Sequence, residues 1–187
     1  MTAQFGPSAL ATPANLVTFG RLVFTVPLLG FIARGGAAWP TLALWIALAA
    51  TDGVDGYLAR RHGTTRSGAF LDPLADKVLV LGAMVALVGI DAVWWVPVAI
   101  IAARELGIQA LRSYWGRQGL AVPARPSAKV KAVVQDVAVG CALAPVVVDN
   151  WPGLVDVALW AAVALTVSSG AQYLLEGRAA TSAVGAR

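Results

Sequence analysis

Six long apolar runs constrain the fold of this chain more than any other feature of its sequence. They extend over residues 14–33, 39–57, 70–90, 93–103 with a continuation to 114, 130–148 and 154–175. A membrane-spanning helix needs about 20 apolar residues, and backbone groups in lipid must form their hydrogen bonds within the helix. The runs therefore predict an all-α, polytopic membrane protein with six transmembrane helices. The chain of 187 residues is 58% hydrophobic and 13% charged, which leaves no room for a separate soluble domain.

We expect residues 1–187 to form a single integral membrane domain. Residues 1–13 are predicted to be an N-terminal cytoplasmic segment, residues 14–176 the six-helix membrane domain and residues 177–187 a disordered tail. The N-terminus lacks the basic leader and the cleavage site of a signal peptide, so the first span should be retained. The chain has one cysteine, Cys141, so a disulfide framework is not expected.

The basic residues predict how the chain lies in the membrane. If the N-terminus is cytoplasmic, thirteen of the 14 Lys and Arg residues lie on the cytoplasmic side, and only Arg34 lies outside. Basic residues concentrate on the cytoplasmic side of membrane proteins, so both termini and the active face should be cytoplasmic, in a bacterial cell membrane. The tryptophans Trp39, Trp94, Trp95 and Trp151 fall near the outer ends of the spans, as an interfacial aromatic belt would. Nucleic-acid binding is not expected, because the basic residues form no patch interleaved with aromatic residues.

Four of the 10 acidic residues gather within residues 51–77. Asp52 and Asp55 are three residues apart, and Asp72 and Asp76 are four apart, so each pair shares one face of a helix. The short connection "RRHGTTRS" makes these helices antiparallel neighbours whose acidic faces can meet. Carboxylates so arranged repel unless a cation lies between them. Oxygen ligands without His or Cys favour Mg²⁺ or Mn²⁺, and two ions could hold the attacking and leaving oxygens of a phosphoryl displacement.

The four acids also allow a simpler interpretation. Each acid could instead pair with Arg60, Arg61 or Lys77, or cap a helix. However, an unneutralised acid near the bilayer centre costs about 2.5 to 3.5 kcal/mol, so four of them suggest a function. Gly56 and Ala59 lie on the same face as the first pair and would give a nucleobase close access to the backbone, although a helix-packing contact is an alternative.

The spacing of these residues resembles the signature of the CDP-alcohol phosphotransferases, Asp-x2-Asp-Gly-x2-Ala-Arg followed by Gly-x3-Asp-x3-Asp. The matching residues are Asp52, Asp55, Gly56, Ala59, Arg60, Gly68, Asp72 and Asp76. The resemblance implies a six-helix, usually dimeric membrane enzyme that displaces CMP from a CDP-linked lipid with an alcohol acceptor. It also implies that the aspartates ligate the metals, that Asp76 is in addition the base toward the acceptor hydroxyl, and that Gly56 and Ala59 line the cytidine pocket.

Basic residues further along the chain are candidates for binding the acceptor. Arg104, Ile108 and Arg112 lie on one helical face, and Lys129 and Lys131 follow a predicted helix start. Four cations suffice to hold a dianionic phosphate. Membrane topology and contact with lipid headgroups are the alternative reason for basic residues at these positions.

Four shorter strings, "NLVTFGRL", "FLDPLADK", "AREL...LR" and "KVK", resemble those of the phosphatidylglycerophosphate synthases. This resemblance covers residues 15–139 and implies CDP-diacylglycerol as donor, sn-glycerol 3-phosphate as acceptor, and phosphatidylglycerophosphate and CMP as products. In the first string, Asn15 and Arg21 are candidates for contacting the diphosphate, with capping and topology as alternatives.

Three alternative functions remain open at this point. The same fold could use another acceptor, namely phosphatidylglycerol as in a cardiolipin synthase, inositol phosphate or serine. A cation channel or transporter also carries acids in the membrane, but it would not explain the clustered Arg and Lys residues. A structural scaffold would not explain why the chain keeps four acids that are energetically unfavourable in the membrane.

Overall fold

The computed structural model describes the backbone of residues 13–62, 66–117 and 127–185, and the side chains of residues 16–51, 74–116 and 130–177. Every element in these ranges is a helix, which confirms the predicted all-α class. The elements are α1 (Pro13–Gly35), α2 (Trp39–His62), α3 (Arg66–Gly89), α4 (Trp95–Arg117), α5 (Ser127–Leu143), α6 (Pro145–Asn150) and α7 (Pro152–Gly185). The first four contain 23 or 24 residues each. Helices of that length are about 35 Å long and exceed a hydrocarbon core of about 30 Å.

Two helix boundaries differ from the sequence prediction. The apolar run 130–148 is divided at Ala144, which lies between the end of α5 at Leu143 and the start of the short helix α6 at Pro145. Proline lacks the N–H that would continue the α5 hydrogen-bond pattern and is favoured in the first turn of a helix. At the C-terminus, α7 continues to Gly185 through residues predicted to be a disordered tail. The run "RAATSA" is rich in alanine, the residue with the highest helix propensity, so it can extend the helix.

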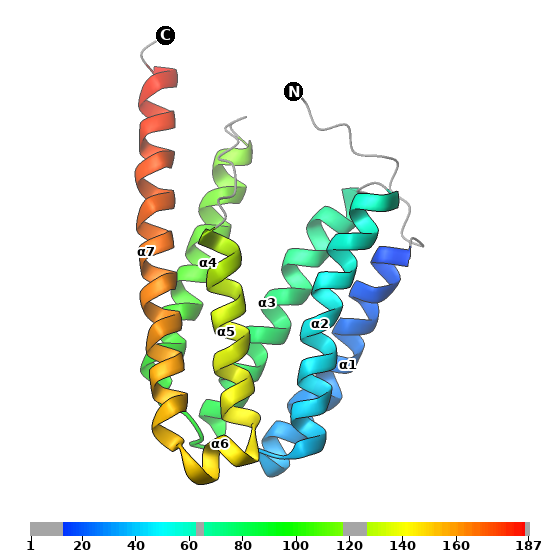
Figure 1. Cartoon of the computed structure of the whole chain (residues 1–187). Coiled ribbons are helices and arrows are strands. Elements are labelled where there is room, and N and C mark those ends of the chain that lie inside the picture. Colours follow the sequence, from blue (N-terminus) through cyan, green and yellow to red (C-terminus); the bar gives the residue numbers. More distant parts are fainter. Residues whose placement is uncertain (1–12, 63–65, 118–126, 186–187) are drawn as a thin grey trace.

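The long helices form two groups that share one bundle (Figure 1). Helix α1 packs against α2 and α3, whereas α7 packs against α4 and α5. The two groups meet where α3 contacts α4 and α5 and where α2 contacts α5. The beginning of α1 and the end of α7 lie at the same end of the bundle (Figure 1). Helix α3 is therefore the element that joins the acidic region of the sequence to the basic residues of α4 and α5.

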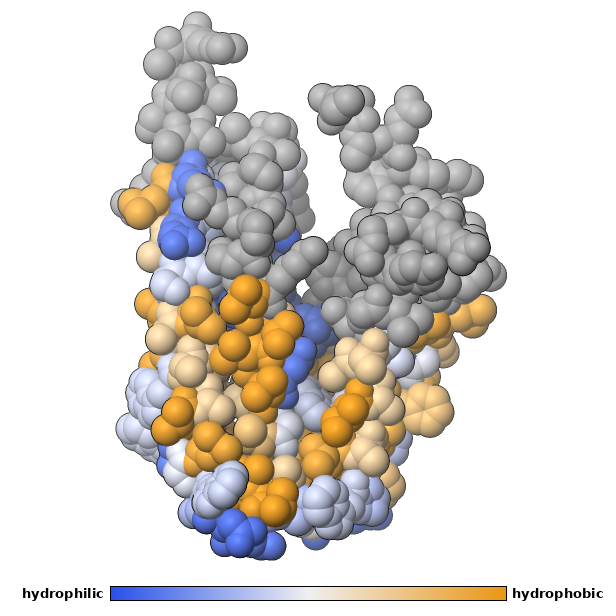
Figure 2. All heavy atoms as spheres, viewed as in Figure 1, coloured by the Kyte–Doolittle hydropathy of each residue, from blue (hydrophilic) through white to orange (hydrophobic). Residues whose placement is uncertain are grey.

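The bundle buries an apolar core near its centre and exposes apolar side chains on its outside. Leu28, Met84, Ile101, Leu143 and Leu159 are buried in one cluster that draws on α1, α3, α4, α5 and α7. Large apolar side chains are also exposed along α1, including Phe19 and Phe24, and along α7. Figure 2 shows one outer face, on which hydrophobic residues predominate across the middle of the bundle. Exposed apolar surface of this extent is typical of contact with lipid.

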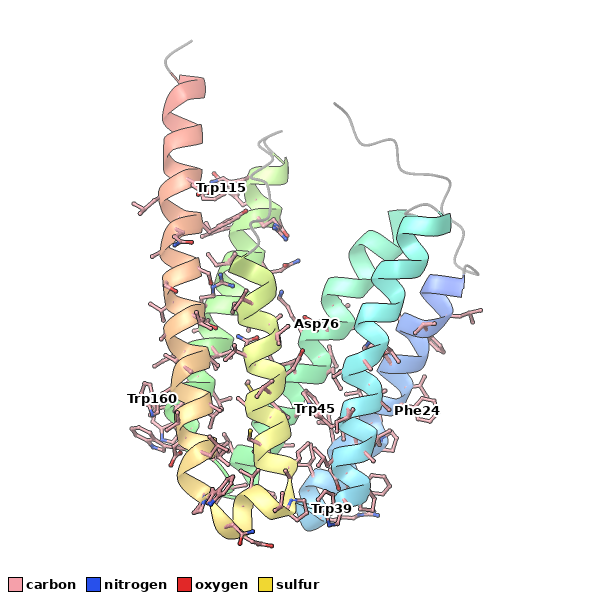
Figure 3. All side chains as sticks on the ribbon, in the orientation of Figure 1. Phe24, Trp39, Trp45, Asp76, Trp115 and Trp160 are labelled. Atoms are coloured by element: carbon pink, nitrogen blue, oxygen red, sulfur yellow. The ribbon has the colours of Figure 1, made fainter. Side chains whose placement is uncertain are left out.

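Two helices in the described part of the chain are long and apolar enough to cross a membrane by themselves. They are Leu16–Gly35 of α1, with a mean hydropathy of 1.9, and Pro152–Gly177 of α7, with a mean hydropathy of 1.7. Helix α2 contributes a shorter apolar stretch, Trp39–Thr51. Trp39, Trp94, Trp95 and Trp151 are exposed, and Figure 3 shows Trp39 at the end of the bundle opposite the end of α7. These features support a membrane protein, while the full set of six spans stays a prediction.

Candidate functional site

The four aspartates of the predicted metal site lie on two consecutive helices. Asp52 and Asp55 belong to the second half of α2, and Asp72 and Asp76 belong to the first half of α3. Only residues 63–65 separate these helices, so both acidic halves lie at the same end of the bundle (Figure 1). The predicted helical placement of all four residues is therefore correct.

The two acidic halves are also matched in depth along their helices. Asp52 lies ten residues before the end of α2, and Asp76 lies ten residues after the start of α3. Ten residues correspond to about 15 Å along a helix axis. Asp55 and Asp72 lie seven and six residues from the same ends, which corresponds to about 10 Å. The backbone thus provides two levels, each with one aspartate from each helix.

The structure describes the side chain of one of these aspartates. Asp76 is half-buried and lies where α3 passes α5 (Figure 3). The structure does not describe the side chains of most other residues predicted for the donor site, namely Asp52, Asp55, Asp72, Gly56, Ala59, Arg60, Gly68 and Asn15. Among the described side chains, no group of three His, Cys, Asp or Glu residues lies close enough to hold a metal ion. The predicted metal site is therefore placed by its helices and stays a prediction at the level of side chains.

Arg21 reaches the residue that precedes the signature. Its side chain is 1% exposed, and its Nε donates a hydrogen bond to Thr51 Oγ1 at 3.1 Å. Thr25 Oγ1 in turn donates to the Arg21 carbonyl oxygen at 2.7 Å. A buried guanidinium needs a polar or anionic neighbour. Here that neighbour is Thr51, which directly precedes Asp52 in the chain. The structure thus brings Arg21, predicted from the sequence, beside the beginning of the acidic region.

A carboxylate and three cations from three helices form a second polar region, which we call the cationic cluster. Glu105 of α4 is 8% exposed, and Lys131 of α5 is 7% exposed. Lys131 Nζ and Arg104 Nη1 both donate to Glu105 Oε1, the latter at 2.9 Å. Lys77 Nζ of α3 lies 3.6 Å from Glu105 Oε2. Because Lys77 directly follows Asp76, the cationic cluster adjoins the acidic region on α3.

Arg104 is also held from the side of α7. Its Nη2 donates a hydrogen bond to Ser169 Oγ at 2.9 Å. A Cβ added at Gly170 would lie 3.0 Å from Arg104 Nε and 3.2 Å from its Cγ, so the glycine makes room for this side chain. Arg104 Nε itself is buried and has no hydrogen-bond partner among the described residues. Arg104 borders a groove of about 350 Å³ between α4 and α7, lined by Gly107, Ile108, Leu111, Val167, Gly170, Ala171 and Leu174.

The predicted common face of Arg104, Ile108 and Arg112 exists and is turned toward α7. Arg104 bonds Ser169, Ile108 lines the groove, and the Arg112 guanidinium carbon lies 5.9 Å from the centre of the Tyr173 ring. Arg112 is eight residues beyond Arg104, about 12 Å further along the helix. Its described contact is with an aromatic ring rather than with the cationic cluster. The structure therefore joins Arg104 and Lys131, while the phosphate-binding roles predicted for Arg112 and Lys129, whose side chain lies outside the described residues, stay predictions.

Two members of the cationic cluster had no predicted role at the site. The sequence suggests Lys77 only as a possible partner of an aspartate, and it suggests no separate role for Glu105. The available signal was the pair "RE" inside the apolar run of α4, because an acidic residue at such a position needs a cationic partner. That partner is Lys131, which lies 26 residues from Glu105 in the chain. Residue spacing within one helix does not reveal a partner on another helix.

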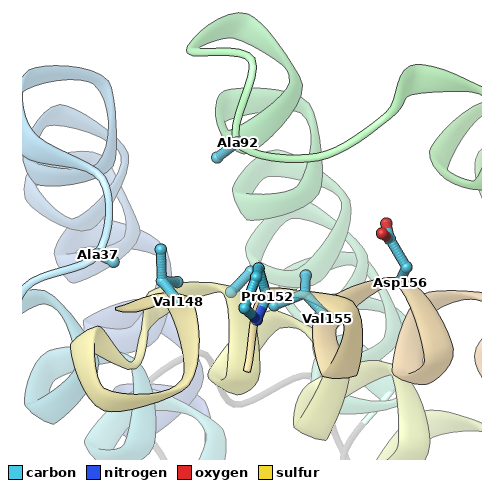
Figure 4. Close-up of a pocket in the computed structure, with 7 residues that line it drawn as sticks. Ala37, Ala92, Val148, Pro152, Val155 and Asp156 are labelled. Atoms are coloured by element: carbon cyan, nitrogen blue, oxygen red, sulfur yellow. The ribbon is translucent and has the colours of Figure 1, made fainter. Parts of the chain in front are cut away.

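A smaller pocket lies at the opposite end of the bundle, where the connections between helices meet (Figure 4). It has a volume of about 220 Å³ and is lined mainly by apolar residues, namely Ala37, Ala92, Ala142, Val148, Pro152 and Val155, with the carboxylate of Asp156 beside them. One exposed carboxylate offers neither the charge nor the number of ligands needed for a metal or phosphate site. Substitutions at this end of the molecule are therefore expected to leave activity unchanged and can serve as controls for substitutions at the other end.

A family model described as CDP-alcohol phosphatidyltransferase matches residues 11–168. The chain belongs to this family. The match includes the acidic halves of α2 and α3 and the whole cationic cluster. Enzymes of the family need a divalent metal ion.

Curated members of the family resemble the chain over most of its length. A "Probable phosphatidylglycerophosphate synthase" from Mycobacterium tuberculosis (strain ATCC 25618 / H37Rv) is 38% identical over 90% of this chain and 83% of its own. A "CDP-diacylglycerol--glycerol-3-phosphate 3-phosphatidyltransferase" from Escherichia coli (strain K12) is 39% identical over 88% of this chain and 89% of its own. The protein of the same name from Bacillus subtilis (strain 168) is 42% identical over 70% of this chain and 69% of its own.

The residues of the acidic region suit the metal ion that the family needs. The signature contributes carboxylates from two consecutive helices, and none of its fixed positions is His or Cys. Carboxylate oxygens are the ligands that hard divalent cations such as Mg²⁺ and Mn²⁺ prefer. The donor set therefore fits such an ion.

Proposed function

We propose that this chain transfers the phosphatidyl group of CDP-diacylglycerol to sn-glycerol 3-phosphate, giving phosphatidylglycerophosphate and CMP. The observation that carries the proposal is the cationic cluster beside Asp76, because it offers a phosphorylated acceptor a cationic site next to the acidic signature. The names of the relatives from E. coli and B. subtilis describe the same donor and acceptor. An acceptor without a phosphate, such as serine, would have no use for three buried or half-buried cations.

The donor would be bound by the acidic region and by the residues around it. We assign metal binding to Asp52, Asp55, Asp72 and Asp76, with two Mg²⁺ or Mn²⁺ ions as the preferred occupants. Bound divalent metal would supply charge neutralisation for the diphosphate and for departing CMP. Gly56 and Ala59 would line the cytidine pocket, and Arg60, Gly68, Asn15 and Arg21 would complete the binding of the CDP-lipid. The buried position of Arg21 beside Thr51 supports its part in this group.

The acceptor would be held by the cationic cluster and activated by Asp76. Arg104 and Lys131 would bind its phosphate directly, and Arg112 and Lys129 would contribute further positive charge to the acceptor phosphate site. Asp76 would take the proton from the primary hydroxyl of the acceptor. The hydroxyl oxygen would then form a bond to the β-phosphorus of the donor, while the bond from that phosphorus to the CMP oxygen breaks. Half-burial of Asp76 and the fixed cations beside it would hold the two reacting groups in one orientation.

The proposed setting is a bacterial cell membrane, crossed by six helices, with the site on the cytoplasmic side. The exposed apolar surface of α1 and α7 supports contact with the lipid bilayer. The asymmetric distribution of basic residues supports the cytoplasmic placement of the site. A homodimer is proposed from the family resemblance.

The test is an acceptor competition with the purified chain and labelled CDP-diacylglycerol. Glycerol 3-phosphate, phosphatidylglycerol, inositol phosphate and serine are offered together, and the labelled lipid products and CMP are separated. We expect phosphatidylglycerophosphate to account for nearly all product, with one CMP released per lipid formed. A different main product would show that another acceptor is the substrate. Metal flux through liposomes without CMP release would show that the protein is a transporter rather than an enzyme.

A further inference from the structure

We propose that Glu105 is a positioning residue for the acceptor phosphate, acting through Lys131 and Arg104. The inference rests on the proposed function and extends it to a residue that the signature does not contain. Its basis is the cationic cluster, in which one buried carboxylate contacts three cations from α3, α4 and α5.

The charges of the cationic cluster match a phosphate monoester. Lys77, Arg104 and Lys131 carry three positive charges, and Glu105 carries one negative charge, so the group has a net charge of about +2. A phosphate monoester carries about −1.5 to −2 at neutral pH. Without Glu105, three cations would repel one another in a poorly solvated region before the acceptor arrives. The carboxylate therefore allows the cations to be assembled in advance while leaving enough positive charge to bind the acceptor.

The bonds of the cationic cluster also fix where the cations point. Lysine has a flexible four-carbon stem, and ordering it when a ligand binds reduces affinity. Glu105 Oε1 binds both Lys131 and Arg104, so one oxygen sets the separation of the two groups proposed to hold the phosphate. Ser169 and Gly170 hold Arg104 from the opposite side. Among the described contacts, Lys131 uses only one of its three N–H donors, which leaves donors available for a ligand.

A purely structural role for Glu105, as a link between helices, predicts a different experimental result. Such a link would contribute to stability, and its loss would affect both substrates alike. The chain offers a matched control, because Gln135 Nε2 of α5 donates a buried hydrogen bond to Thr166 Oγ1 of α7 at 2.9 Å. Thr166→Val removes this buried link between helices without touching the cationic cluster. It should lower thermal stability while leaving both Michaelis constants unchanged.

The test compares Glu105→Gln, Glu105→Asp and Thr166→Val in the purified full-length chain. Michaelis constants are measured for glycerol 3-phosphate at saturating CDP-diacylglycerol and for CDP-diacylglycerol at saturating glycerol 3-phosphate. We expect Glu105→Gln to raise the constant for glycerol 3-phosphate by about tenfold or more, as expected for weakened charged hydrogen bonds, and to change the constant for CDP-diacylglycerol less than twofold. Glu105→Asp keeps the charge but shortens the reach, so a smaller rise is expected from a variant that should fold. Equal changes in both constants, or no change in either variant, would overturn the inference.

A binding measurement separates this inference from the proposed function. Thermal unfolding of the wild-type chain is followed with and without inorganic phosphate at constant ionic strength. We expect phosphate to raise the unfolding temperature of the wild type and of Thr166→Val, and to have a clearly smaller effect on Glu105→Gln and Glu105→Asp. If the wild type transfers nothing to glycerol 3-phosphate, the proposed function fails. The effect of phosphate on the unfolding temperature still shows whether Glu105 positions a phosphate site. If glycerol 3-phosphate is a good acceptor but phosphate protects all four proteins equally, the positioning role fails alone.

Discussion

The acidic region and the cationic cluster differ in how the chain builds them. The acidic region comes from residues 52–76 on two consecutive helices, and the spacing of the aspartates and the short connection between the helices place them at one end of the bundle. The cationic cluster takes Lys77, Arg104, Glu105 and Lys131 from three helices, and tertiary packing brings them together. The first region carries the signature by which the chain resembles its family. The second, which depends on the packing of α4 and α5 against α3, is where the choice of acceptor can be made.

In the proposed function the acidic region binds the donor and the cationic cluster binds the acceptor. Removal of the metal should then give the largest effect of all. We expect excess EDTA to reduce CMP release below detection, because the diphosphate and the leaving CMP would lose their neutralising charge. Adding Mg²⁺ or Mn²⁺ should restore activity, and titrating each ion would identify the preferred one. Turnover that survives thorough chelation would remove the acidic region from the chemistry.

Asp76→Asn should have the next largest effect, because it removes the proposed base while preserving shape. We expect the turnover number to fall by roughly 10²- to 10⁴-fold, as is typical for loss of general base catalysis. Binding of CDP-diacylglycerol, measured with labelled lipid, should be largely retained. Asp156→Asn at the opposite end of the bundle is the matched control and should behave as the wild type. Near-normal turnover of Asp76→Asn would reject the assignment of the base.

Gly170→Ala should affect the cationic cluster alone and by a smaller amount. The added Cβ would lie 3.0 Å from Arg104 Nε, and Arg104 is held on both sides by Glu105 and Ser169. We expect the Michaelis constant for glycerol 3-phosphate to rise several-fold, with that for CDP-diacylglycerol unchanged.

Gly177→Ala on the same helix is the control for Gly170→Ala. Its added Cβ would lie 1.9 Å from the ring of Trp115, which stacks on Tyr173. This variant should lose about 1 to 3 kcal/mol of stability through overpacking and change both Michaelis constants less than Gly170→Ala changes that for glycerol 3-phosphate. If Gly177→Ala shifts the constant for glycerol 3-phosphate as much as Gly170→Ala does, the effect comes from α7 as a whole rather than from Arg104.

Arg112→Ala should give the smallest effect. Arg112 lies over Tyr173 rather than in the cationic cluster, and an exposed cation–π contact is worth about 0.5 to 1 kcal/mol. We expect a two- to fivefold rise in the Michaelis constant for glycerol 3-phosphate, caused by a weaker long-range attraction for the acceptor. An unchanged constant would remove Arg112 from the acceptor site, whereas a rise above about tenfold would mean that it contacts the phosphate directly.

The sequence predicted well whatever depends on local spacing. The helical class, the placement of Asp76 on α3 and the common face of Arg104 and Arg112 follow from the periodicity of helices. The end of α5 at Leu143 was missed because the run 130–148 is apolar on both sides of Pro145. Apolarity by itself does not show whether a proline bends or ends a helix. Glu105 was missed for a different reason. Its partners lie on other helices, and no periodicity within one helix records such a contact.

Lys131→Met tests the division between donor and acceptor regions most directly, because it removes one charge of the cationic cluster and preserves the length of the side chain. Both Michaelis constants are measured in parallel with the wild type. The account predicts a rise of about tenfold or more for glycerol 3-phosphate, from the loss of a charged hydrogen bond, and less than a twofold change for CDP-diacylglycerol. An equal rise for CDP-diacylglycerol would contradict it, because the two regions would then bind the same substrate.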